Sequence, residues 1–205
     1  MTRTWVALLL AAFTVSAARA ELVNARSESR SAAQGVAAAI RQIADRPAAW
    51  ITYRVPMAAD RGRHLCDGWS GRTFLEPPRE LVVLARIESG AVTHVRTSSP
   101  DCEVDAGGMP VVALTDVSAA ESASWLGSVI ASAAASGGRR DRVWQPAISA
   151  LGLQDGPAAI AELIQLAQTT RDPDLRREAV NWLTRATDPK AREFVTNVLT
   201  SSNRR

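Results

Sequence analysis

The stretch DPDLRREAVNWLTRATDPK, residues 172–190, decides the fold of the C-terminal part of the chain. It opens with Asp172-Pro173, and Asp188-Pro189 follows near its end. Asp caps a helix N-terminus, and Pro suits the first turn, where a backbone N–H has no partner within the helix. Each Asp-Pro pair therefore predicts the start of a helix. The apolar residues between the two pairs share one helix face: Leu175, Ala179, Trp182, Leu183 and Ala186.

The same pattern occurs earlier in the chain, at an offset of 32 residues. Residues 147–151 align with residues 179–183, and Pro157 then falls on Pro189. A period of this length is typical of stacked supersecondary units. We therefore expect a series of antiparallel helices that bury one face against one another. The expected helices cover residues 140–151, 157–169 and 173–186, and a fourth begins at residue 189.

Residues 140–205 resemble a HEAT-repeat protein, in particular one of the short bacterial HEAT-like kind. The resemblance rests on Asp172, Leu175, an Arg at 176 or 177, Ala179 and Leu183. It implies a stack of helical hairpins whose second helices, here residues 173–186, hold another protein. The residues implied as contacts are Arg176, Arg177, Asn181 and Arg185. Alternatively, this face is merely solvated, with Arg176 or Arg177 paired to Asp172 or Asp174 to brace the turn.

Residues 21–136 have a different pattern, which predicts an α+β domain with a small antiparallel sheet flanked by helices. An Ala-rich helical pattern covers residues 27–45, and an alternating strand pattern covers residues 50–55. Ser118-Ala-Ala-Glu121 is a capping box that predicts a helix to about Ala135. Gly137 and Gly138 lie in a predicted linker, residues 137–139, before the HEAT-like domain.

The most distinct strand pattern is a hairpin over residues 81–97, which turns at Ser89-Gly90. A two-residue loop pairs Ile87 with Val92, so His94 is expected on the same face as these two residues. Residues 111–114 are a candidate for a third strand of the main sheet. Residues 56–78 lie between strands without a clear period, which predicts a long loop.

The first twenty residues predict a cleaved signal peptide. Arg3 precedes an apolar run of about ten residues, and Ala18-Arg19-Ala20 gives the small-x-small cleavage pattern. Glu21 would then be the mature N-terminus, and we expect an exported protein, periplasmic or extracellular. No later stretch reaches about 18 apolar residues, so no membrane span is expected in the mature chain.

The predicted export decides how the two cysteines, Cys66 and Cys102, are interpreted. In an oxidising compartment an isolated pair is most simply a disulfide. A sharper alternative is an exported enzyme or metal-binding protein, with a site around His64, Cys66, Asp67 and His94. The chain lacks the CxxC and HxxxH spacings that would support a metal site, so no metal and no cofactor are predicted.

Composition excludes several classes of function. The chain has 205 residues, 46% of them hydrophobic and 22% charged, which is unlike a disordered chain. The net charge of +3 is too small for a polyanion-binding tail, and no nucleic-acid partner is predicted. No P-loop, dinucleotide fingerprint, HExxH or GxSxG motif is found. The sequence therefore predicts a non-enzymatic protein that binds a protein partner of unknown identity or serves as a scaffold.

Overall fold

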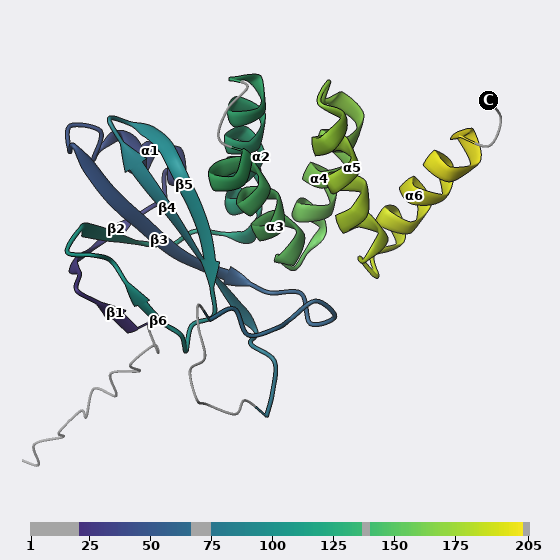
Figure 1. Cartoon of the computed structure of the whole chain (residues 1–205). Helices are drawn as coiled ribbons and strands as arrows, with labels where there is room; N and C mark the ends of the chain where they lie inside the picture. The colour runs from purple at the N-terminus through teal and green to yellow at the C-terminus, as the bar shows by residue number, and fades with distance from the viewer. Residues whose placement is uncertain (1–20, 67–74, 137–139, 203–205) are drawn as a thin grey trace, which may run out of the picture.

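The computed structural model describes residues 21–66, 75–136 and 140–202. A twisted sheet forms one side of the molecule, and a row of helices extends from it to the C-terminus (Figure 1). The predicted signal peptide, residues 1–20, and the predicted linker, residues 137–139, lie outside the described residues. None of the helices in the described parts of the chain is both long and apolar enough to cross a membrane.

The main sheet has five strands and confirms the α+β class. It is mixed, whereas the sequence analysis expected an antiparallel sheet. The reason is β7, which pairs in parallel with both β2 and β3, while β3–β4 and β4–β5 are antiparallel. The strands, in their order across the sheet, are β2 (Arg26–Ser31), β7 (Pro110–Thr115), β3 (Ala48–Pro56), β4 (Glu80–Glu88) and β5 (Ala91–Ser98).

The predicted helix over residues 27–45 is wrong in its first part. Residues 26–31 form the edge strand β2, and helix α1 covers only Val36–Arg41. Strand β2 has the sequence RSESRS, which contributes no apolar residue to a helical stripe. The apolar period that suggested a long helix is confined to Val36, Ile40 and Ile43, and all three are buried.

Two short strands form a second, parallel sheet, β1 (Glu21–Val23) with β6 (Glu103–Asp105). Val104 of β6 packs against Val82 and Leu84 on the face of the main sheet that points away from the helices. Strand β1 begins at Glu21, the residue predicted as the mature N-terminus.

The hairpin of β4 and β5 turns at Ser89-Gly90, as predicted, and Ile87 pairs with Val92. The register shifts next to this pair, because Thr93 is an extra residue and Arg86 pairs with His94. A bulge of this kind moves all later side chains to the opposite face. His94 therefore lies on the face opposite Ile87 and Val92, which corrects the expectation.

The helices lie in two layers, and the first helices to contact the sheet are α2 and α3. Helix α4 packs against α2 and α5, and α3 packs against the same two helices. Helix α6 follows at the end, against α4 and α5. The predicted starts at Pro157, Pro173 and Pro189 are confirmed. The bounds are α2 (Ala119–Ala135), a π-helical turn η1 (Arg140–Trp144), α3 (Gln145–Leu153), α4 (Pro157–Thr169), α5 (Pro173–Thr184) and α6 (Pro189–Ser202).

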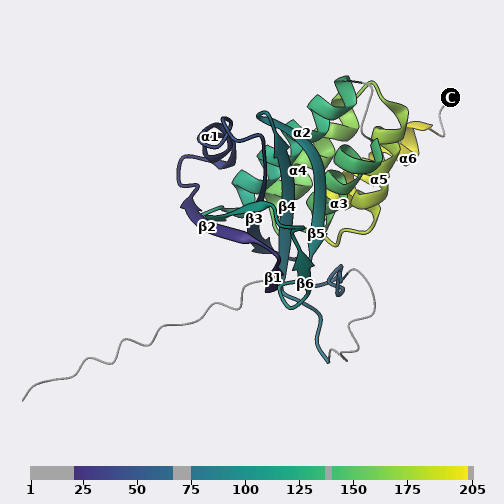
Figure 2. The ribbon, with the colours of Figure 1, turned by 60° about the vertical axis from the view of Figure 1, so that its left-hand side comes forward.

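Helix α2 joins the sheet to the stack, because it packs on both. Figure 2 shows the helices against one face of the sheet. On that face the Tyr53 hydroxyl of β3 shares a 2.9 Å hydrogen bond with Ser122 of α2, and Trp125 meets the Tyr53 ring edge-on at 5.9 Å. One hydrophobic core runs from the sheet through α2 to Ala191 of α6. The stack of helices therefore begins at α2, ahead of the predicted linker.

A second connection comes from the segment after β3. The backbone N–H of Ala58 donates to the Leu153 carbonyl at 3.0 Å, and the Arg61 side chain donates to the Gly152 carbonyl at 2.6 Å. Both acceptors lie in the last turn of α3, where the carbonyls have no partner within the helix. The beginning of the long loop thus caps α3 and joins the sheet to the stack.

Candidate functional site

Helix α5 carries the residues that the HEAT resemblance implies as contacts. Its N-terminus is held by Asp172, whose carboxylate accepts from the N–H groups of Asp174 (2.8 Å) and Leu175 (3.2 Å). The side that faces the stack is fully buried and consists of Leu175, Ala179, Trp182 and Leu183. The opposite side of α5 remains open to solvent.

Three of the four implied contacts follow one another along this open side. Arg177, Asn181 and Arg185 are spaced at i, i+4 and i+8, which places them on one stripe of the helix. Arg177 is ion-paired with Asp174, and the Arg185 guanidinium lies 5.1 Å from the centre of the Trp182 ring. We call these three residues the α5 stripe. Its two arginines are exposed but already held in place by neighbours.

Arg176 is separated from this stripe. One residue of helix corresponds to a turn of about 100°, so Arg176 points well away from Arg177. Its guanidinium donates to the Thr170 carbonyl at 2.6 Å, in the turn between α4 and α5. Arg176 therefore braces the turn through a backbone oxygen, and Arg177 pairs with Asp174, as the alternative interpretation of this face expected.

A groove of about 510 Å³ lies between the end of α2 and the turn that joins α4 to α5. Its lining includes the apolar side chains of Leu166 and Leu175 and the charged side chains of Arg171 and Asp172. Three alanines of α2 complete the wall: Ala131, Ala134 and Ala135. The sequence analysis missed this groove because it assigned α2 to the other domain. The run of alanines near the end of α2 was the available signal.

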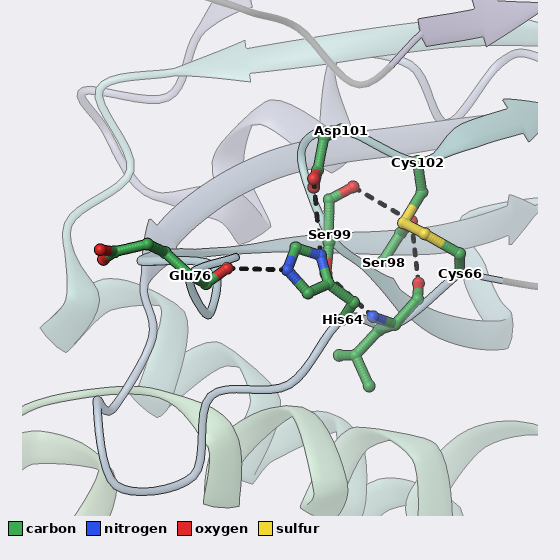
Figure 3. Close-up of polar contacts among 8 residues, drawn as sticks. His64, Cys66, Glu76, Ser98, Ser99, Asp101 and Cys102 are labelled. Atoms are coloured by element: carbon green, nitrogen blue, oxygen red, sulfur yellow. Dashed lines mark hydrogen bonds and ion pairs between the residues drawn. A yellow bond between two sulfur atoms is a disulfide. The ribbon is translucent and has the colours of Figure 1, made fainter. Parts of the chain in front are cut away.

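The two cysteines form the predicted disulfide, with Sγ atoms 2.02 Å apart (Figure 3). Serines at the end of β5 hold the Cys66 side of the bridge. The Ser99 hydroxyl accepts from the Leu65 N–H at 2.9 Å, and the Ser98 hydroxyl donates to the Leu65 carbonyl at 3.3 Å. The Cys102 N–H in turn donates to the Ser99 carbonyl at 3.1 Å. The bridge thus joins the segment that ends at Cys66 to the turn after β5.

His64 lies beside the bridge, with both ring nitrogens near protein oxygens (Figure 3). Its Nε2 is 2.9 Å from the Glu76 carbonyl, and its Nδ1 is 3.4 Å from the Asp101 carboxylate. Since both sulfurs are in the disulfide, neither is a thiolate nucleophile or metal ligand. Asp67, the third residue of the alternative site, lies outside the described residues.

His94, the last member of that alternative site, lies elsewhere. It is four residues before Ser98 on β5, a distance of about 13 Å along a strand. Its ring centre is 6.5 Å from that of Trp50. Burial, followed by the nearby guanidinium of Arg142, lowers the pKa of His94. Within residues 21–66, 75–136 and 140–202, no three His, Cys, Asp or Glu side chains are grouped as a metal site requires.

Comparison of the chain with protein-family models, with curated proteins and with solved structures gave no match. The interpretation of the surfaces therefore depends on their own geometry.

Proposed function

We propose that this is an exported, non-catalytic binding protein whose HEAT-like stack, α2 to α6, docks a protein partner through the α5 stripe. The observation that carries the proposal is the division of α5 into a fully buried side and an open polar side. Extended helical stacks of this kind present long binding surfaces to other proteins.

The chemistry of the α5 stripe favours an acidic surface on the partner. Arg185 is held over Trp182 and Arg177 beside Asp174, so little side-chain freedom is lost when the arginines bind. A guanidinium offers several fixed donors to carboxylates, which makes Arg a frequent contributor of binding energy. Asn181, between the two arginines, can both donate and accept hydrogen bonds.

Export is supported by the disulfide, because such bridges persist in oxidising compartments. The proposal predicts that the mature protein begins at Glu21. N-terminal sequencing of the protein purified from the cell envelope or medium tests this directly, and an N-terminus at Met1 would contradict export through the predicted leader.

The docking proposal is tested by charge reversal at Arg177 and Arg185 together. The matched control reverses Arg26 and Arg41, two exposed arginines of the sheet side. After cross-linking in the envelope, we expect the double variant on α5 to lose the partner that wild type and control retain, at an unchanged melting temperature. Equal recovery of that partner by all three proteins would contradict the proposal. Arg176 is left intact because its loss would weaken the turn.

A further inference from the structure

The helical stack ends in a helix that is only partly covered. Each of α2, α3 and α4 packs on the next two α-helices of the chain, whereas α5 packs on α6, and residues 140–202 contain no helix after α6. Helix α6 thus stands at the free end of the row (Figure 1). In stacked-helix proteins neighbours cover the apolar side of each unit, so a terminal unit needs a polar outer face or another cover.

The apolar side of α6 becomes more exposed along the helix. Ala191, Phe194, Val195 and Leu199 are spaced at i, i+3, i+4 and i+8, so they share one face. Ala191 is fully buried, Phe194 and Val195 are partly buried against the core, and Leu199 is 64% exposed. We call Phe194, Val195 and Leu199 the α6 face. A contact that removes these side chains from water is favourable.

The α6 face lies in an uncharged part of the helix. Residues 194–202 contain no Lys, Arg, Asp or Glu, and the charged residues of α6, Lys190, Arg192 and Glu193, precede them. This distribution matters for a contact between two identical chains, because each charge near a two-fold axis meets its own kind. Two copies of residues 194–202 bring no like charges together.

The open side of α5 has the opposite property. It carries Arg177 and Arg185, both exposed, so two copies of that side would repel each other. Helices that cross at about 50° move apart on either side of the crossing point, which keeps residues 190–193 of two crossed α6 helices away from the contact. Of these two surfaces of the stack, the α6 face is therefore the one suited to a second copy.

We propose that the α6 face binds the α6 face of a second copy of this chain, so that each α6 takes the place of the next helix for the other copy. Leu199 of one copy packs on Phe194 and Val195 of the other, in a two-fold symmetric contact of antiparallel helices. This inference goes beyond the docking of another protein, because it requires no partner except the chain itself and uses none of the α5 stripe.

The contact is small, so the dimer is reversible. It is formed by three large side chains from each copy, whereas stable complexes bury about 1,600 Å² and contacts below about 1,200 Å² are typical of weak, transient association. We therefore expect monomers at low micromolar concentration and dimers as the concentration approaches the millimolar range.

The test is sedimentation velocity of the purified protein, with its disulfide intact, from micromolar to millimolar concentration. Leu199→Asp should weaken the dimer at least about tenfold, because it places a carboxylate in an apolar contact. Leu199→Met keeps an apolar side chain of similar volume and should retain the dimer. The matched control is Leu75→Asp, the same change at a side chain that is 95% exposed in the loop before β4. Melting temperatures establish that all three variants are folded.

Hydrogen exchange of wild type locates the contact independently of any variant. The amides of residues 194–202 should exchange more slowly at millimolar than at micromolar concentration, while those of β2 and of the first turns of α5 exchange equally at both. The proposal is overturned if wild type sediments as a monomer at every concentration, if Leu75→Asp weakens the dimer as much as Leu199→Asp, or if the slowed amides lie on another surface.

Discussion

The sheet and the helical stack differ in how far apart in the sequence their contacting residues lie. In the sheet, neighbours come from distant positions: the Ser31 hydroxyl at the end of β2 donates to Asp116 just after β7, 85 residues away. In the stack, each helix packs on the next one or the one after it. The sheet therefore depends on closing long loops, whereas the stack depends on helix caps and on close packing between adjacent helices.

The largest expected effect is on the sheet side. The disulfide links residues 36 positions apart, and the chain-entropy argument gives it roughly 3–4 kcal/mol of stability. Replacing Cys66 and Cys102 together by Ser should lower the free energy of unfolding in urea by about this amount. A reducing agent should do the same to wild type and leave the double variant unchanged. An equally stable double variant would show that the loop is held by its hydrogen bonds alone.

The next effect concerns two glycines of the stack. A Cβ at Gly152 of α3 would overlap the Trp182 ring, which is enclosed in the core, and overpacking of this kind costs about 1–3 kcal/mol. A Cβ at Gly127 of α2 would meet the carboxylate end of Glu162, which can rotate aside. Gly152→Ala should therefore lower the urea midpoint much more than Gly127→Ala. Equal losses would mean that α2 and α4 are as tightly fitted as α3 and α5.

A smaller effect is expected at the caps. Asp172→Ala leaves two N–H groups of α5 without their acceptor and should cost about 1 kcal/mol, while Asp172→Asn should retain most of the stability. Thermal unfolding of the two variants beside wild type measures the difference. If the Asp172→Ala and Asp172→Asn variants have the same melting temperature, Pro173 alone determines where α5 begins.

The smallest effect depends on pH. Burial raises the pKa of Glu162. Because this pKa is higher in the folded protein than in the unfolded chain, its contribution to stability is complete at low pH and is lost as the pH rises through the folded pKa. Glu162→Gln should thus be more stable than wild type at pH 7 and equal to it near pH 3. Glu193→Gln, at an exposed position of α6, is the control, and a gain of equal size there would argue against burial as the cause.

The difference between local contacts and contacts distant in the sequence explains which features were predictable from sequence. The helix starts at Pro157, Pro173 and Pro189 and the turn at Ser89-Gly90 depend on a few adjacent residues, and all were predicted correctly. The disulfide was also predictable, because the chain has two cysteines and an export-like leader.

The errors share a non-local cause. Strand β2 owes its conformation to pairing with β7, and its own residues give no strand pattern. The bulge at Thr93 is a single inserted residue that alternation cannot reveal. The groove combines elements from separate parts of the sequence, α2 and the α4–α5 turn. This surface was not accessible from residue patterns alone.

The parallel pairing of β2 with β7 also orders events during synthesis. Residues 26–31 leave the ribosome early, yet their only strand partner in the described sheet, residues 110–115, follows some eighty positions later. The nascent N-terminal segment must wait while the β4–β5 hairpin, whose contacts are local, can already form. Adding β2 is therefore a late step, and we expect it to limit the rate at which the newly made chain becomes resistant to proteases.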